Sequence, residues 1–235
     1  MSSHTHSLSV LVLLCAAFPA QLFRVVAAMA GGGPARPGRS LWTLWLPGAF
    51  VLVALLLWYV APATGLTRLP SSWLWILVAV LAGVAALVLE VAAAALPARL
   101  RGRRTGGVRL HQGWTDRGAL ALAGVLVIAV AEEVIFRGIG LYLLAQQLAV
   151  PVAVAVAVTA LGYGLNHLYF GWSTVGQKTL TGVLYGGLFV ASGYSLLVPA
   201  VAHLVQNLVV LTVVPRLPSR RAAAAPVRGT AGAPA

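Results

Sequence analysis

Long apolar segments alternate with short polar breaks along most of the chain. A bilayer core about 30 Å thick needs a helix of about 20 residues, and seven segments approach that length. Backbone amides and carbonyls find no water inside lipid, so each segment is predicted to be helical. The predicted spans are residues 8–30, 42–61, 73–96, 119–145, 150–166, 179–191 and 196–214. The sixth is short, which favours a tilted or partly re-entrant helix.

Composition assigns the chain to the same class. Hydrophobic residues make up 60% of the sequence and charged residues 9%, with a mean hydropathy of +0.93. Soluble domains carry about 25% charged residues. The expected fold is therefore an all-α polytopic membrane protein, a bundle of about seven transmembrane helices in the lipid bilayer. The single Cys15 excludes a disulfide framework and a cysteine-based metal site.

The positive charge of the chain is informative about topology. The net charge is +12, but Lys and Arg lie almost wholly in the breaks between apolar segments, so no nucleic-acid partner is expected. Four predicted spans separate the basic loop 99–117 from the basic tail 216–235, which puts both on one side of the membrane. We expect a multi-pass protein of the cell inner (plasma) membrane, with its N-terminus outside and its C-terminus cytoplasmic.

Two adjacent carboxylates lie deep inside the fourth predicted span. An ionisable residue at that depth is a functional-site hypothesis by default. On a helix, Glu133 and Arg137 share a face at i, i+4 and can pair, while Glu132 points about a quarter-turn away. Glu133 and Arg137 are therefore predicted to be structural, and Glu132 is left without a partner. The alternative is a buried ion-pair cluster that only ties helices together.

Further polar side chains recur at membrane depth in later spans. His167 follows the fifth span, and His203 and Asn207 share a face of the seventh at i, i+4. A single intramembrane histidine more often serves helix packing than catalysis. Buried polar groups in lipid need partners, however, so these residues and Glu132 are expected to meet in one cavity. Counting residues from the loops puts His167 nearer the cytoplasmic end than Glu132, which predicts a tilt or kink.

The inventory of residues excludes several catalytic arrangements. No histidine is followed by glutamate, so the His-Glu-x-x-His zinc motif is absent, and Asp116 is the only aspartate, which excludes an aspartyl dyad. Ser195 precedes His203 by eight residues, more than two helical turns, which is poor geometry for a nucleophile and its base. The chemistry that remains is glutamate and histidine acting on water.

Three motifs in order resemble those of a known family. Glu-Glu-x-x-x-Arg at 132–137, Tyr-x-x-x-His at 163–167 and His-x-x-x-Asn at 203–207 are similar to the CAAX-processing and bacteriocin-processing (Abi) intramembrane glutamic-type proteases. Tyr stands where Phe is usual in the second motif. The chain then divides into N-terminal helices with a basic loop (1–115), a CAAX-protease-like catalytic core (116–215) and a disordered basic tail (216–235).

The resemblance implies hydrolysis of a peptide bond inside the membrane. The substrate is expected to be a membrane-anchored protein or peptide, and the Ala/Arg/Gly-rich composition is typical of a bacterial chain. Glu132 in a cavity of low dielectric suits a general base, with His167 holding the water. His203 and Asn207 would then donate hydrogen bonds to the oxyanion. This metal-free interpretation is favoured, but Glu132, His167 and His203 would also suit a zinc ion.

Two hypotheses from other classes remain open. A non-catalytic immunity or scaffold protein of the same fold would keep the Arg137 pairing without a strict need for Glu132. A small proton-coupled transporter would also place Glu and His at membrane depth.

The charge pattern makes a direct prediction of topology. Reporter fusions at Thr105 and Thr230 are expected to report a cytoplasmic location for both, because the two basic segments lie on one side. Fusions that report opposite sides would show that the number of spans between them is odd.

Overall fold

The computed structural model describes residues 40–60, 64–100 and 118–213, and all of the regular structure in these ranges is helical. The first predicted span, the basic loop from 101 to 117 and the tail from 214 onward lie outside the described residues. The helices are α3 (Ser40–Val60), η1 (Thr64–Thr67), α4 (Leu74–Leu100), α5 (Ala119–Glu133), η2 (Val134–Leu141), η3 (Leu143–Gln147), α6 (Val152–Leu165), η4 (Leu168–Phe170), α7 (Trp172–Ala191), α8 (Leu197–Leu208) and η5 (Val209–Val213).

Hydropathy located most of these helices. α3, α4, α6 and α8 begin within two residues of the predicted spans, and α5 continues through the π-helical turns η2 and η3 as one segment from Ala119 to Gln147. Two segments, Leu74–Leu96 and Ala119–Gln147, are long and apolar enough to cross a membrane, and three shorter apolar helices accompany them in the described residues. The described part of the chain therefore fits a membrane protein, but it does not establish seven spans.

The prediction that the sixth segment is short was wrong. α7 begins at Trp172 and runs for 20 residues, seven residues earlier than the apolar run suggested. Its first turns carry polar side chains, which lowered the hydropathy of the segment. Thr174 Oγ1 donates to the carbonyl of Phe170, and Lys178 Nζ donates to Glu90 Oε1, so the helical backbone continues where the apolar pattern does not.

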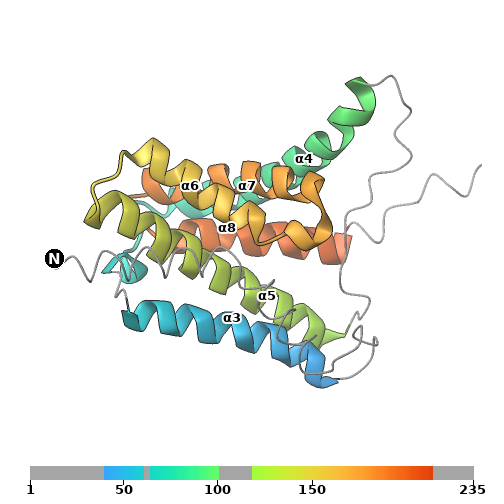
Figure 1. Cartoon of the computed structure of the whole chain (residues 1–235), viewed down its shortest axis with the longest axis horizontal. Helices are drawn as coiled ribbons and strands as arrows, with labels where there is room; N and C mark the ends of the chain where they lie inside the picture. Colours follow the sequence, from blue (N-terminus) through green and yellow to red (C-terminus); the bar gives the residue numbers. More distant parts are fainter. Residues whose placement is uncertain (1–39, 61–63, 101–117, 214–235) are drawn as a thin grey trace, which may run out of the picture.

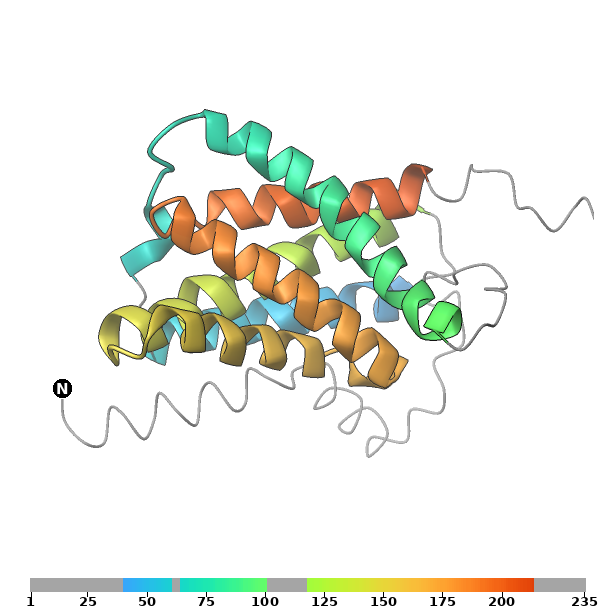
Figure 2. The same ribbon diagram turned by 90° about the horizontal axis from the view of Figure 1, so that it is seen from above.

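The helices form a bundle in which helices that are not consecutive along the chain often pack together. α3 lies along α5, and α6 lies along α7 (Figure 1). α8 contacts both α4 and α5 and so connects the two sides of the bundle. Seen from above, α4 crosses α8 obliquely and lies beside α7 (Figure 2). This arrangement surrounds the middle of the segment from Ala119 to Gln147 with α6, α7 and α8.

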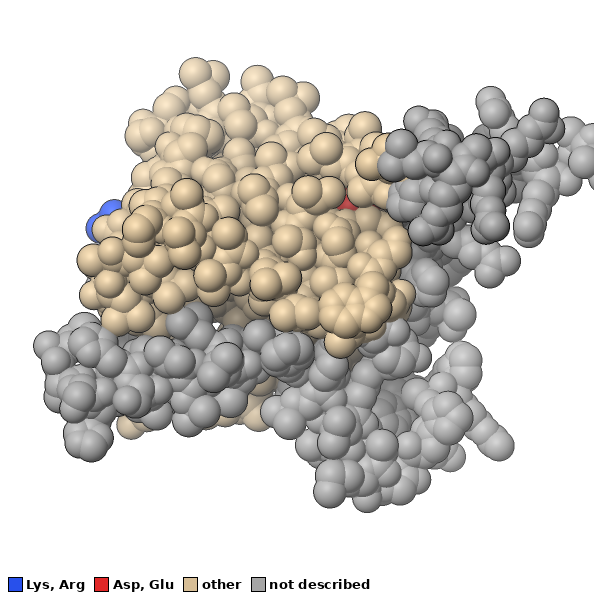
Figure 3. Space-filling model, turned by 45° about the horizontal axis from the view of Figure 1, so that its top comes forward, with Lys and Arg blue, Asp and Glu red and all other residues tan. Residues whose placement is uncertain are grey.

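The outer surface is mostly apolar. Large hydrophobic side chains are exposed on several helices, among them Leu52 and Leu56 of α3 and Leu77 and Leu81 of α4. The face in Figure 3 carries very few charged side chains among the described residues. Apolar surface of this extent is unusual for a soluble monomer and suits contact with lipid.

Small residues allow α4 and α8 to approach closely. A Cβ atom on Gly83 would collide with the carbonyl oxygen of Ala202 and would lie 2.9 Å from Cβ of Val205. Ala79, Ala82 and Ala86 of α4 are buried in the same contact. Van der Waals packing of small residues is a main source of helix association in lipid.

Replacement of this glycine tests the contact. Gly83→Ala is expected to lower the thermal midpoint of the detergent-solubilised protein, because the added methyl group meets α8 backbone. Gly187→Ala is the matched control: its Cβ would meet nothing within 4 Å, and alanine favours a helix over glycine by about 1 kcal/mol. Equal midpoints for the two variants would argue against the close α4–α8 contact.

Candidate active site

The centre of the bundle holds a buried ion pair on the segment from Ala119 to Gln147. Arg137 Nη1 donates to Glu133 Oε1 at 3.0 Å, and its Nη2 donates to the carbonyl of Gly182 in α7 at 3.2 Å. Both side chains are at most 1% exposed. The guanidinium also lies over the ring of Tyr163, 4.6 Å from its centroid. Arg137 thus reaches α6 and α7 from one helix.

Glu133 has a second partner that sequence spacing did not suggest. His203 Nδ1 lies 2.8 Å from Glu133 Oε1. A carboxylate oxygen can only accept here, so Nδ1 carries the hydrogen and donates. The same oxygen therefore accepts hydrogen bonds from both Arg137 and His203. The bond from His203 connects α5 to α8. The other oxygen, Oε2, is buried and has no hydrogen-bond partner in the described part of the chain.

Glu132 lies beside this pair but has different surroundings. Asn166 Nδ2 donates to its Oε1 at 3.0 Å. The Nε2 atom of His167 is 3.8 Å from Oε1, and the Nε2 atom of His203 is 3.9 Å from Oε2. Both histidines are beyond direct hydrogen-bond distance from the carboxylate. Three parts of the chain, α5, the end of α6 and α8, therefore meet at Glu132.

The structure brings His167 beside Glu132, and the helical segment becomes π-helical directly after Glu133. Glu132 lies fifteen residues before Gln147, where the helical segment ends, and His167 lies fifteen residues after Val152, where α6 begins. Counted from the short turn that joins these helices, the two residues are equally far along the chain. Counting from the other loop failed because the segment from Ala119 to Gln147 is much longer than α6.

The ring of His167 is oriented by its own helix. Its Nδ1 lies 2.9 Å from the carbonyl oxygen of Tyr163, one turn earlier. A carbonyl oxygen only accepts, so Nδ1 is the donor. In a neutral ring, Nε2 is then an acceptor, and it faces Glu132.

Two tyrosines form walls of the site. The Tyr163 hydroxyl lies 3.5 Å from His203 Nε2, and its ring packs edge-on against His167 with 5.0 Å between centroids. The Tyr185 hydroxyl donates to Gln206 Oε1 at 2.7 Å, and its ring lies 5.5 Å from that of His203. These contacts fix the histidine rings by packing as well as by hydrogen bonds.

Asn207 stands apart from the other predicted site residues. It follows His203 by one turn and is partly exposed, and among the described residues its side chain has no hydrogen-bond partner. Sequence reasoning missed Asn166, Tyr185 and Gln206, which complete the polar cluster. Asn166 could have been found by the signal that identified His167, since it is a polar residue at membrane depth.

Glu132, His167 and His203 are the residues that could hold a metal ion. Within the described ranges, the His, Cys, Asp and Glu side chains form no ready-made cluster of three metal ligands. His203 Nδ1 donates to Glu133, and both Nε2 atoms face Glu132 across almost 4 Å. Zinc binds nitrogen and oxygen ligands at about 2.0–2.2 Å from the ion, so these separations between ligand atoms are compatible with an ion between Glu132 and either ring.

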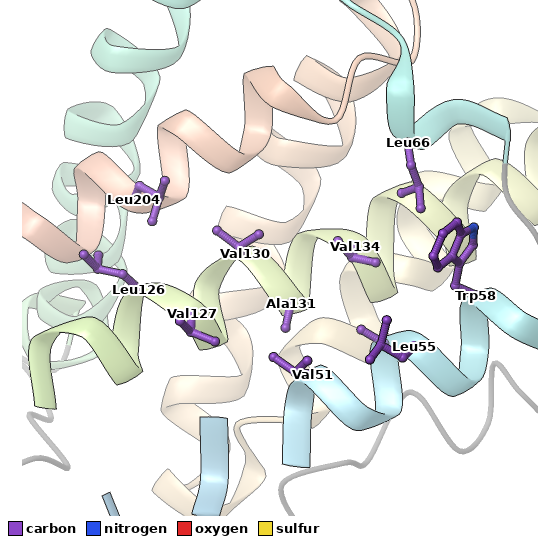
Figure 4. A pocket seen from close by; sticks show the side chains of 11 residues that line it. Val51, Leu55, Trp58, Leu66, Leu126, Val127, Val130, Ala131, Val134 and Leu204 are labelled. Carbon is purple, nitrogen blue, oxygen red and sulfur yellow. The ribbon is translucent and has the colours of Figure 1, made fainter. Parts of the chain in front are cut away.

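An apolar cavity of about 620 Å³ lies on another face of α5. It is lined by α3, α5 and α8 and by Leu66 of η1, with Val51 and Trp58 on one side and Leu204 on the other (Figure 4). Ala131 and Val134, which also line it, flank the two glutamates in sequence. The cavity does not include any polar residue of the site, so the candidate active site is the buried polar cluster.

Removal of Arg137 tests the buried ion pair. Arg137→Ala is expected to reduce the amount of protein in membranes, because losing one partner of a buried pair costs about 3–5 kcal/mol. Arg68→Ala is the matched control, since Arg68 is exposed and should accumulate normally. Immunoblots of the membrane fraction give the measurement. Equal accumulation of the two variants would contradict the structural role.

Comparison with known protein families identifies a match to part of the chain. Residues 114–209 match the family model of the type II CAAX prenyl endopeptidase Rce1-like proteins, and the match includes Glu132, Asn166, His167, His203 and Asn207. No curated protein and no solved structure matches the chain. Residues 114–209 therefore belong to the Rce1-like type II CAAX prenyl endopeptidase family, a family of membrane peptidases, as the three motifs predicted.

Proposed function

We propose that the chain is an intramembrane endopeptidase that hydrolyses a peptide bond of a membrane-anchored protein or peptide with water activated by Glu132. The observation that carries the proposal is the unequal state of the two glutamates. Glu133 accepts hydrogen bonds from Arg137 and His203. Glu132 accepts a hydrogen bond from the neutral amide of Asn166, and the imidazole rings of His167 and His203 lie almost 4 Å away. The family match supports peptidase activity in general terms.

The water in this proposal lies between Glu132 Oε1 and His167 Nε2. Both atoms are acceptors, and 3.8 Å separates them, so one water molecule can donate a hydrogen bond to each. Its lone pair is then free to attack a carbonyl carbon. As the new C–O bond forms, Glu132 takes the proton from the water. The proton passes to the leaving nitrogen when the C–N bond breaks.

His203 and Asn207 are proposed to stabilise the oxyanion. His203 donates to Glu133 through Nδ1, and a second proton on Nε2 would give it a donor toward the reacting carbonyl. Asn207 can supply an amide donor one turn away. Preorganised donors of this kind contribute several kcal/mol of transition-state stabilisation.

The proposed cellular setting follows the charge pattern of the sequence. The chain would be a multi-pass protein of the inner (plasma) membrane of a bacterium, with the basic loop and tail in the cytoplasm. Its partners would be the bilayer and its substrate. The polar cluster uses only side chains of the chain itself, so the proposal includes no cofactor.

The proposal predicts that cleavage depends on Glu132. A deletion strain is complemented with the wild-type gene or with the Glu132→Gln variant. Mass spectrometry of the membrane fraction then identifies peptide termini that are absent from the deletion strain. Glu132→Gln should accumulate like the wild type, because glutamine keeps the shape and can still accept from Asn166, but it should produce none of the new termini. Identical termini from both would favour a non-catalytic scaffold or a transporter.

The roles of Asn207 and of metal are tested together on purified enzyme, with a peptide that spans one of the identified cleavage sites. Asn207→Ala should lower turnover by about 10²-fold through loss of an oxyanion donor. Exhaustive chelation should leave wild-type turnover unchanged. Activity that is lost on chelation and restored by zinc would instead make Glu132, His167 and His203 a ligand set.

A further inference from the structure

The side chain of Tyr163 has a hydroxyl group that its packing contacts do not use. Tyr163 lies in α6 and is fully buried. Phe136 packs edge-on against its ring with 5.5 Å between centroids, and the Arg137 guanidinium lies 4.6 Å from the ring centroid. Both contacts need only the aromatic ring. They hold the ring in place and thereby determine where the hydroxyl lies.

The hydroxyl of Tyr163 faces the imidazole of His203. Its oxygen lies 3.5 Å from Nε2, and the two rings are perpendicular, with 6.0 Å between centroids. This separation is longer than a typical hydrogen bond of about 2.7–3.2 Å. Nδ1 of His203 already donates to Glu133, so Nε2 is the nitrogen that remains for the reacting group. The hydroxyl and Nε2 can therefore both turn to a third atom beside them.

A single oxygen atom of a substrate can accept hydrogen bonds from both groups. Once Nε2 carries the second proton described above, the imidazole and the hydroxyl are both donors. Oxyanion donors lie about 2.7–3.1 Å from the oxygen that they stabilise, and tyrosine is among the side chains that serve in this way. Two donors 3.5 Å apart can both lie at that distance from one oxygen. Tyr163 thus offers a buried donor beside His203, whereas Asn207 is partly exposed.

The position of this donor pair fits the direction of attack by the proposed water. The water bridges Glu132 Oε1 and His167 Nε2, which are 3.8 Å apart. Nε2 of His203 lies 3.9 Å from the other oxygen, Oε2. The water and the donor pair therefore lie beside different oxygens of one carboxylate. A carbonyl group bound at Glu132 can then present its carbon to the water and its oxygen to the donor pair.

We propose that Tyr163 is a further catalytic residue, whose hydroxyl donates a hydrogen bond to the oxyanion beside His203 Nε2; this rests on the proposed function. As the bond from water to the carbonyl carbon forms, the π electrons of the C=O bond move to its oxygen. The hydroxyl stabilises that negative charge and keeps its own proton. When the C–N bond breaks, the C=O bond re-forms, and the proton held by Glu132 goes to the leaving nitrogen.

The first test removes the hydroxyl and keeps the ring. Purified Tyr163→Phe is compared with the wild type on a peptide that spans an identified cleavage site. The value of kcat should fall by about 10²-fold, while KM stays within a few-fold, because an oxyanion donor acts in the transition state. Tyr142→Phe is the matched control, since Tyr142 is a buried tyrosine that packs against Tyr194 outside the polar cluster. It should keep the wild-type kcat.

The second test identifies the atom that accepts the hydrogen bond. The peptide is prepared with sulfur in place of the scissile carbonyl oxygen, because sulfur is a weak acceptor. Tyr163→Phe should lower turnover of this thioamide much less than it lowers turnover of the amide. The ratio between the two peptides does not depend on the amount of folded enzyme, so the test also holds if Tyr163→Phe accumulates poorly. An equal loss on both peptides would overturn the inference.

The pH dependence of kcat separates a direct donor from a residue that acts through His203. A direct donor predicts that Tyr163→Phe keeps the shape of the wild-type profile at a lower height. A hydroxyl that only hydrogen-bonds to Nε2 would instead change how readily His203 takes up a proton, and its loss would displace the profile along the pH axis. Such a displacement would overturn the inference.

The outcomes also separate this inference from the proposed function. Cleavage that depends on Glu132, together with an unchanged kcat in Tyr163→Phe, would overturn the role of Tyr163 and leave the peptidase proposal in place. Identical termini from the wild type and Glu132→Gln would overturn the peptidase proposal, and the role of Tyr163 would fall with it.

Discussion

The structure depends on how two adjacent carboxylates are accommodated inside an apolar bundle. An unpaired charge in such surroundings is very costly, so each carboxylate needs partners from neighbouring helices. Arg137 lies one turn after Glu133 and can pair with it on the same helix. Its second nitrogen donates to α7, and His203 reaches Glu133 from α8. The neutralisation of one glutamate thereby fixes the relative positions of three helices.

The hydrogen bonds and the ion pair of Glu133 determine which partners remain for Glu132. Arg137 and His203 are engaged by Glu133, so the direct hydrogen bond to Glu132 comes from the neutral amide of Asn166. The imidazole of His167 is held at 3.8 Å by the bond from its Nδ1 to the α6 backbone. In the proposed reaction, one water molecule bridges these two acceptor atoms. A structural ion pair and a site suited to proton transfer thus arise from neighbouring residues with different partners.

The sequence predicted those features that depend on neighbours within one helix. Hydropathy located most of the described helices, and the i, i+4 spacing gave the pair of Glu133 and Arg137. Contacts between helices were harder to predict from the sequence, because they depend on how deep each helix lies in the bundle and on how it is rotated about its axis. The bond from His203 to Glu133 and the bond from Asn166 to Glu132 could not be read from spacing. The partly buried ion pair of Lys178 with Glu90 was not recognised, because the two residues are 88 positions apart in the sequence.

The central claim is that the two glutamates have different tasks, and the isosteric variants Glu132→Gln and Glu133→Gln test it side by side. Membrane accumulation and cleavage are measured for both in the same cells. Glu132→Gln should accumulate normally and fail to cleave, whereas Glu133→Gln should accumulate poorly because Arg137 loses its counter-charge. Equal accumulation of the two variants, or cleavage by Glu132→Gln, would contradict the account.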